Sequence, residues 1–136
     1  MEERALSVIH PDILTCGGML ENKKIANMAQ DHGVAMAIHM AESPIGCMAA
    51  VHCSAAAPDN FLACEYHSAD VSWWGDIIEG PSKPIVKDGY IEVPDTPGLG
   101  IETLNNEVIR EHIHSENKGL WKATDEWDNE WSNDRE

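Results

Sequence analysis

The sequence predicts an α/β fold in which strand, loop and helix repeat around a parallel sheet. Three apolar runs of strand length each end on a polar residue: Asp12, His39 and Glu65. These residues lie 27 and 26 positions apart, which is about the length of one βα unit. Because strands that alternate with helices form parallel sheets, the polar residues are expected along one sheet edge. The spacing fits a βα barrel and a doubly wound open sheet equally well.

Two amphipathic segments fill the intervals between the three runs. The first ends at Asp31-His32-Gly33, where Gly33 is a plausible C-cap, and the second begins at the helix-start signal Glu42-Ser43-Pro44. Their apolar stripes, including Met28 and Met48, are expected in the core. His52 lies on the second stripe and is expected to be a hydrogen-bonded core histidine, whereas His10 could face either the sheet interior or solvent.

The second half of the chain has a different character. Two short alternating runs around Asp88-Gly89 predict a β-hairpin, and Asn105 opens a short helix that runs to His112. The polar stretch 113–136 is acidic and carries three tryptophans, so it is too polar to bury a core of its own. These tryptophans are expected to pack on a neighbouring surface.

Composition excludes several classes of protein. The chain has 24 acidic and 9 basic side chains, a net charge of −15, which argues against a nucleic-acid partner. It has no apolar run long enough for a bilayer and no secretion signal at its start, so we expect no membrane partner and a cytoplasmic location. The four cysteines lack paired spacing and are expected to be reduced, buried thiols; a zinc site with His52 or His67 is disfavoured.

Several motifs in order resemble one known family. His10-Pro11-Asp12, Gly17-Gly18, Ala37-Ile38-His39, Glu65, Gly89-Tyr90-Ile91 and the run 97–101 resemble the carboxyl-terminal part of the mandelate racemase and muconate lactonizing enzyme family, in the enolase superfamily. The resemblance extends from Ser7 to about Trp131. It implies the last three strands of a modified (β/α)8 TIM-type barrel, plus a short hairpin segment of the capping domain. The implied divisions are 1–80 for the barrel units, 81–112 for the capping return segment and 113–136 for the acidic tail.

The resemblance also implies a chemistry for the strand ends. Asp12 would orient His39, which would abstract the proton α to a substrate carboxylate or act as a general acid, and Glu65 would hydrogen-bond the developing enediolate. From its position shortly after Glu65, His67 is expected at the pocket rim, in contact with the substrate, and Trp73 and Trp74 either line the pocket wall or anchor the capping segment. The implied enzyme is a magnesium-dependent acid-sugar dehydratase; a racemase or cycloisomerase of the same family remains the alternative. Which sugar acid is used stays open. A further alternative is that the three polar residues only cap their strands.

The family's magnesium ligands lie on earlier barrel strands. We therefore expect no metal ligands in this chain, which looks like a carboxyl-terminal fragment that is inactive when isolated. Its open sheet edges predict a homo-oligomer, or association with a complementing amino-terminal chain. A truncated module that only associates with a partner chain is the non-catalytic alternative.

Overall fold

The computed structural model describes residues 5–66 and 71–116, and its centre is a three-stranded parallel sheet. The strands are β1 (Val8–Ile9), β2 (Ala35–Ile38) and β3 (Phe61–Cys64), arranged in the order β1-β2-β3. The ladder between β1 and β2 continues beyond β1 to a bridge between Asp12 and His39. The three predicted strands are confirmed, and their carboxyl ends point in one direction.

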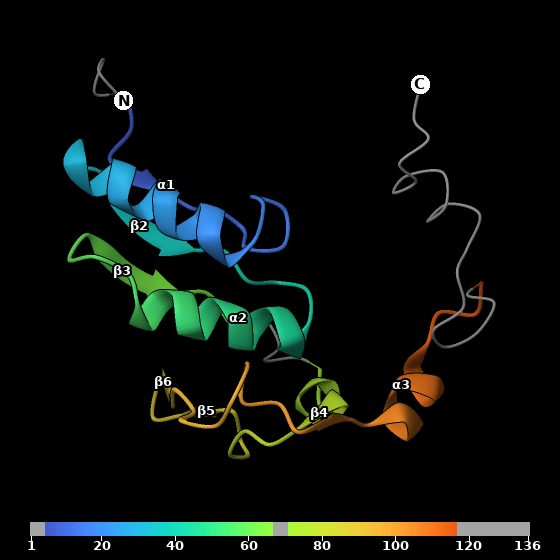
Figure 1. Ribbon diagram of the computed structural model, residues 1–136. Helices are drawn as coiled ribbons and strands as arrows, with labels where there is room; N and C mark the ends of the chain where they lie inside the picture. Colours follow the sequence, from blue (N-terminus) through green and yellow to red (C-terminus); the bar gives the residue numbers. More distant parts are fainter. Residues whose placement is uncertain (1–4, 67–70, 117–136) are drawn as a thin grey trace.

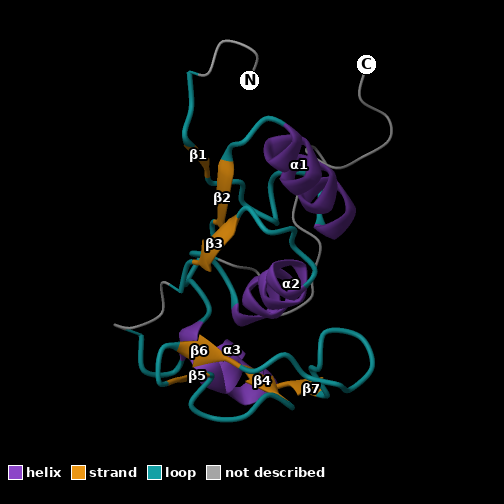
Figure 2. Ribbon diagram, turned by 90° about the vertical axis from the view of Figure 1, so that its left-hand side faces the viewer, coloured by secondary structure: helices purple, strands orange, loops and turns teal. Residues whose placement is uncertain are grey.

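Two helices cover one face of this sheet. α1 (Met19–Asp31) connects β1 to β2, and α2 (Pro44–Ala55) connects β2 to β3. The view in Figure 2 separates the layers, with the strands on one side and both helices on the other. Sequential strand order with both helices on one face is the arrangement of consecutive units in a βα barrel, and it also occurs in one half of a doubly wound sheet.

Local sequence explains where the helices begin and end. The Ser43 side chain accepts a hydrogen bond from the Gly46 backbone N–H, and Pro44 occupies the first turn of α2. At the end of α1, Gly33 has a φ of 66° and donates its N–H to the Gln30 carbonyl oxygen. A positive φ favours glycine at this position, as the sequence predicts.

The core lies between the sheet and the two helices, but one predicted core residue is outside it. Met48 of α2 is fully buried, as expected, whereas Met28 of α1 is 55% exposed and Leu20 is 68% exposed. The expectation for Met28 is therefore wrong. α1 instead buries a face made of small or polar side chains: Asn22, Ala26 and Ala29. Small residues let the helix backbone approach the sheet, so Leu20 and Met28 are turned outward, while Ile25 is partly buried against the core.

The two methionines form a matched test of this packing. Met48→Ala is expected to lower the free energy of unfolding by about 2–5 kcal/mol, because it removes a buried side chain and leaves a cavity. Met28→Ala is expected to change it by less than about 0.5 kcal/mol, because the side chain is mostly solvated. Urea denaturation of the full chain measures both values. Equal effects of the two substitutions would contradict the assignment of α1's buried face.

The second half forms small antiparallel pairs beside α2 (Figure 1). The predicted hairpin is confirmed as β5 (Val86–Lys87) and β6 (Tyr90–Ile91), joined by Asp88 and Gly89 with φ values of 52° and 83°. Positive φ at both positions is typical of a type I′ turn. The 3₁₀ helix η1 (Trp74–Ile77) leads into β4 (Ile78–Glu79), which pairs with β7 (Thr103–Leu104).

The predicted short helix is also confirmed, as α3 (Asn106–His112), and the Asn105 side chain caps it by accepting the N–H groups of Glu107 and Val108. The tail beyond residue 116 lies outside the described residues. In the part of the chain that the structure covers, no helix has the length and apolarity needed to span a membrane.

The cysteines are unpaired thiols. Cys47 and Cys53 are buried, and Cys16 and Cys64 are half-buried. Burial raises the pKa of Cys47 to about 12, so this thiol stays protonated at neutral pH. The prediction of buried, packing cysteines is confirmed for Cys47 and Cys53, and their reduced state stays a prediction.

Candidate active site

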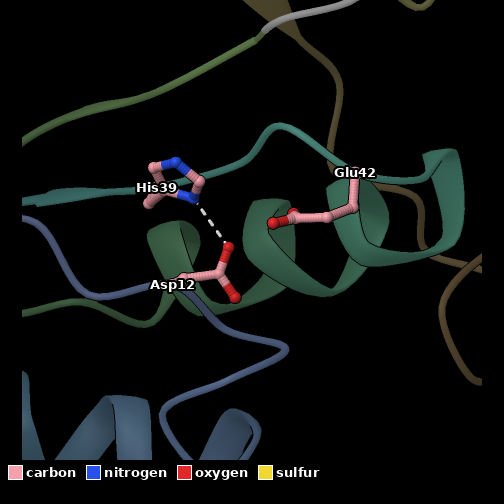
Figure 3. A group of neighbouring side chains, drawn as sticks. All are labelled: Asp12, His39 and Glu42. Carbon is pink, nitrogen blue, oxygen red and sulfur yellow. Dashed lines mark hydrogen bonds and ion pairs between the residues drawn. The ribbon is translucent and has the colours of Figure 1, made fainter.

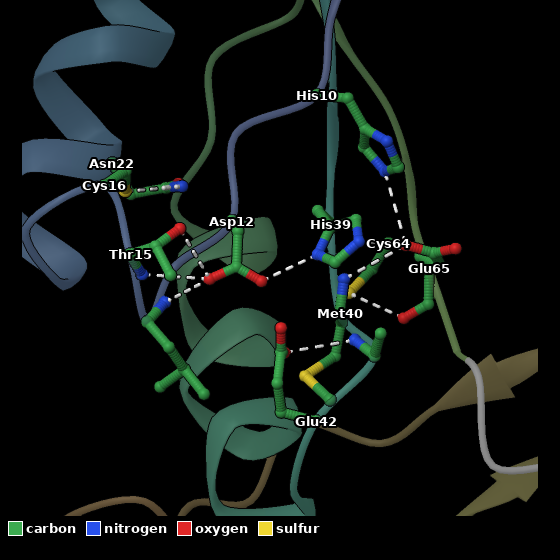
Figure 4. Close-up of polar contacts among 12 residues, drawn as sticks. His10, Asp12, Thr15, Cys16, Asn22, His39, Met40, Glu42, Cys64 and Glu65 are labelled. Atoms are coloured by element: carbon green, nitrogen blue, oxygen red, sulfur yellow. Dashed lines mark hydrogen bonds and ion pairs between the residues drawn. The ribbon is translucent and has the colours of Figure 1, made fainter.

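The sheet brings the three predicted site residues together at its carboxyl edge. Asp12, His39 and Glu65 follow β1, β2 and β3, and Figure 4 shows their side chains converging. The backbone fixes this convergence: His39 N–H donates to the Pro11 carbonyl oxygen at 3.0 Å, and Glu65 N–H donates to the Ile38 carbonyl oxygen at 2.9 Å. The ladder therefore continues beyond the strands and aligns the three residues.

Asp12 and His39 form a closely bonded dyad. His39 Nδ1 lies 2.6 Å from Asp12 Oδ2. The other carboxylate oxygen, Oδ1, accepts the backbone N–H groups of Leu14 at 2.7 Å and Thr15 at 2.9 Å. These bonds fix the carboxylate, whose side chain is only 12% exposed. Asp12 can therefore hold the imidazole with its Nε2 directed away from the dyad.

The dyad shifts the pKa of both partners. The hydrogen bond that His39 donates to Asp12 is the largest influence on His39 and raises the pKa of that imidazole. For Asp12, burial acts to raise the pKa, but the bond with His39 and the backbone N–H groups of Leu14 and Thr15 outweigh it and lower the pKa. The arrangement therefore favours an ionised Asp12 beside a basic His39.

These shifts predict a pH dependence. A raised His39 pKa stabilises the fold below the ordinary value of 6.5, and this contribution is lost as pH rises through the folded-state pKa. A lowered Asp12 pKa stabilises the fold above its ordinary value of 3.8 and is lost as pH falls through the folded-state pKa. The dyad thus contributes most to the stability of the fold at pH values between these two limits.

An NMR titration of the His39 ring in the full chain measures this dependence. The pKa of His39 is expected to lie above 6.5 and to fall toward 6.5 in Asp12→Asn. The stability difference between the two proteins is expected to be larger near about pH 5 than near about pH 9. An unchanged pKa of His39 in the variant would contradict the dyad.

Glu65 lies on the other side of the His39 ring. Its Oε2 accepts the Met40 backbone N–H at 3.2 Å and lies 3.6 Å from His39 Nε2. About a third of each side chain is exposed, 33% for His39 and 32% for Glu65. A small molecule that reaches His39 Nε2 would therefore also meet the Glu65 carboxyl group.

Two further residues lie in this cluster, and neither was predicted there. His10 Nε2 lies 3.6 Å from Glu65 Oε2, so the ring lies against the cluster, although 45% of its side chain is exposed to solvent. Glu42 is brought to the dyad by the loop before α2 (Figure 3). The sequence feature that could have placed His10 in the cluster is its position two residues before Asp12, on the same side of an extended segment. Glu42 gave no separate signal, because it stands within a helix-start motif.

The donor set of the cluster does not suit magnesium. Asp12, His39 and Glu42 offer ligand atoms within 4.8 Å of one another, and this is the one such group among the described residues. One of its three donors is an imidazole, and His39 Nδ1 is already bonded to Asp12. Because Mg²⁺ prefers an octahedral set of oxygen ligands, these residues do not make a magnesium site.

The remaining predicted residues lie elsewhere. His67 falls outside the described residues. Trp73 stacks on His112 of α3, with ring centroids 4.0 Å apart, so its contact with substrate stays a prediction. Its neighbour Trp74 is buried and donates its indole N–H to the Glu42 carbonyl oxygen at 3.2 Å. His52 has a buried Nε2 with no partner among the described residues, so the expectation of a hydrogen-bonded histidine is wrong for this atom.

The chain is similar to known proteins over most of its length. Residues 1–108 match the family described as Enolase C-terminal domain-like. The D-xylonate dehydratase of Haloferax volcanii is 40% identical over 113 residues, which cover 83% of this chain and 26% of that protein. The D-galactarolactone cycloisomerase of Agrobacterium fabrum is 30% identical over 79% of this chain and 29% of that protein.

Solved structures agree with this similarity. The crystal structure of a mandelate racemase/muconate lactonizing enzyme-like protein from Rubrobacter xylanophilus superposes with a TM-score of 0.77 at 39% identity. The match covers 84% of this chain and 28% of that one. The chain thus spans about a quarter to a third of its relatives' length. The predicted α/β fold and the predicted family are confirmed: the chain belongs to the mandelate racemase and muconate lactonizing enzyme family of the enolase superfamily and corresponds to its carboxyl-terminal part.

Proposed function

We propose that the chain carries one half of the active site of an acid-sugar dehydratase. The observation that supports this is the Asp12–His39 bond of 2.6 Å, with Glu65 3.6 Å from the other ring nitrogen, at the ends of three adjacent parallel strands. Carboxyl ends of strands are where βα barrels place their chemistry. His39 acts at Nε2, Asp12 holds its ring, and Glu65 faces the substrate carboxylate.

The dyad handles the protons of the dehydration. The substrate carries a hydrogen on the carbon next to its carboxylate and a hydroxyl on the following carbon. His39 Nε2, as a neutral base, accepts the α-proton, or as an imidazolium it gives a proton to the departing hydroxyl; the other of these two proton transfers is made by an acid or base of the complementing polypeptide. The electron pair of the C–H bond becomes the new C=C bond as the C–O bond breaks. Water leaves, and the resulting enol converts to a 2-keto-3-deoxy acid.

The pKa shifts of His39 and Asp12 fit their roles in the proton transfer. The raised pKa of His39 makes the ring a stronger base, and the ionised Asp12 stabilises the imidazolium that forms. Glu65 is held by the Met40 N–H within reach of the same ring. To stabilise charge that develops on a substrate carboxylate there, the Glu65 carboxyl group must carry a proton that it donates in a hydrogen bond.

The substrate class follows from the relatives. Proteins named D-xylonate, D-galactonate and arabinonate dehydratases match this chain, so we propose a sugar acid as the substrate. The cycloisomerase relative supports the alternative, since a cycloisomerase or a racemase would use the same dyad to move an α-proton. A cytoplasmic location stays a prediction.

We propose that the magnesium ligands lie outside this chain. Bound Mg²⁺ supplies stabilisation of the enediolate in enolase-type sites. The residues of this chain contribute the proton transfer and one hydrogen-bonding carboxyl group. We therefore propose that a complementing polypeptide, carrying the other βα units, completes the site.

The outer edge of β3 is the proposed docking surface for this polypeptide. Among the described residues, β1 and β3 each pair on one side only, because β2 lies between them. An apolar groove borders β3 between α2 and the β5–β6 hairpin and is lined by Val51, Leu62 and Tyr90, among others. Leu62 is 61% exposed and Tyr90 is 80% exposed. The relatives' greater length supports a strand-bearing partner as the occupant.

Mixing experiments test whether a complementing polypeptide docks at the β3 edge. The full chain is combined with the part of the Haloferax volcanii D-xylonate dehydratase that it does not match, and mass is measured by light scattering after gel filtration. We expect a one-to-one complex for the wild type and its loss in Leu62→Lys, which places a charge on the apolar groove. The matched control Leu20→Lys, on the outer face of α1, is expected to leave the complex intact. Homo-oligomers of this chain alone, with no mixed complex, would contradict the docking proposal.

The chemistry is tested in a chimera in which this chain replaces the matching segment of the same dehydratase. We expect the chimera to convert D-xylonate to its 2-keto-3-deoxy product. A folded chimera that neither dehydrates the acid nor exchanges its α-proton would show that Asp12, His39 and Glu65 only cap their strands.

A further inference from the structure

His10 is a second imidazole at the proposed site, and the proton transfer described above does not use it. It directly follows β1 and stands two residues before Asp12. Because the β1–β2 ladder continues to the Asp12–His39 bridge, the segment between is extended. Side chains two positions apart on an extended segment point to the same side, so His10 and Asp12 both face His39.

Both imidazoles meet the same oxygen of Glu65. His10 Nε2 and His39 Nε2 each lie 3.6 Å from Glu65 Oε2. The two rings also contact each other edge to face, with centroids 5.2 Å apart and an interplanar angle of 69°. Figure 4 shows Glu65 reaching between them. At 3.6 Å the contacts are electrostatic, while the Met40 N–H makes the hydrogen bond to this oxygen at 3.2 Å.

The bond to Asp12 determines which ring nitrogen of His39 carries a proton, and so what His39 presents to Glu65. Asp12 accepts a hydrogen bond at His39 Nδ1, so the neutral ring carries its proton there and presents a lone pair at Nε2. While Glu65 is ionised, this lone pair repels its carboxylate. His10 has no such restriction, because among the described residues Glu65 is the one polar partner of its ring. His10 can therefore direct an Nε2–H toward Oε2 in both protonation states of His39.

We propose that His10 is a positioning residue for Glu65, holding its carboxyl group beside His39 while the His39 lone pair is free to act as a base. This inference rests on the proposed function, since it concerns the geometry in which Glu65 meets the substrate. With His10 removed, Glu65 keeps only the Met40 N–H and swings away from the neutral His39 ring. The His10 side chain itself is 45% exposed.

The contact itself is tested in the full chain, without any turnover. Ring-nitrogen chemical shifts of ¹⁵N-labelled histidines are recorded by NMR. Glu65→Gln is expected to move the Nε2 signals of both His10 and His39. The matched control Glu42→Gln is expected to move the signal of His39 alone, because Glu42 lies against the dyad. A His10 signal that is unmoved by Glu65→Gln overturns the proposal, whatever the chimera does.

The positioning role is tested in the chimera. His10→Leu is expected to lower kcat about 10- to 100-fold with little change in KM, because a displaced carboxyl group still allows binding but misaligns it. His10→Gln retains an N–H donor and is expected to recover most of the loss. An active chimera whose kcat is unchanged by His10→Leu overturns the proposal. A wild-type chimera that is inert counts against the proposed function, and the NMR result then decides the His10–Glu65 contact separately.

Discussion

His39→Asn is expected to lower kcat of the chimeric dehydratase by about 10³-fold or more, because it removes the group that transfers the proton. Asparagine has no basic nitrogen, yet it is polar and smaller than histidine, so it fits a position that is 33% exposed. KM for D-xylonate is expected to change much less than kcat. Product formation, followed by the absorbance of a keto-acid derivative, measures both constants.

The control for this variant is another histidine of the same chain. His32 lies at the end of α1, where its Nδ1 contacts the Met28 carbonyl oxygen, away from the cluster. His32→Asn is expected to leave kcat within about twofold. A folded His39→Asn chimera that retains most of its activity would contradict the role of His39 as the proton-transfer group.

Asp12→Asn is expected to lower kcat by about 10²- to 10⁴-fold, by analogy with the loss of the orienting carboxylate in other catalytic dyads and triads. The amide keeps the size of the side chain, but it offers one acceptor oxygen and no charge. The His39 ring is then free to adopt the other tautomer, and its imidazolium loses the stabilising partner at 2.6 Å. The loss of rate is expected to be largest at the pH values at which the wild-type ring acts as a base, because that ring owes its raised pKa to Asp12.

A surface aspartate provides the comparison for this substitution. Asp59 is exposed in the turn before β3, and Asp59→Asn removes the same charge from the chain without touching the dyad. We expect its kcat to match the wild type. Equal losses in the two variants would mean that net charge, and not the bond to His39, controls the rate.

Regular elements were predictable where local sequence determines them. The spacing of Asp12, His39 and Glu65 predicted the three strand ends, because the sheet repeats one βα unit per strand. The Asp88-Gly89 turn and the Asn105 cap were predictable because their backbone geometries favour these residue types. The choice between a barrel segment and an open sheet needed the resemblance, since both share this local pattern.

Features that depend on side-chain orientation were not predictable. In the predicted α1 stripe, Ala29 is buried and Ile25 packs against the core, but Met28 is exposed, because close packing of Ala26 and Ala29 decided which face is buried. His10 could be placed only after the ladder was known to continue past β1. Glu42 reaches the dyad through a loop whose direction depends on Trp74, more than thirty residues later, holding the Glu42 carbonyl oxygen. Such distant contacts leave no local pattern in the sequence.

The most direct test of the central claim is the dehydration of D-xylonate by the chimera, run in D₂O so that exchange of the α-proton is followed together with product. A chimera that contains wild-type His39 is predicted to form the 2-keto-3-deoxy acid, and the folded His39→Asn chimera is predicted to lose product formation. Exchange of the α-proton is lost as well if His39 is the base, and persists without product if His39 is the acid. Product and exchange that persist in His39→Asn, or a folded wild-type chimera that shows neither, would contradict the assignment of the Asp12–His39 dyad as half of a dehydratase active site.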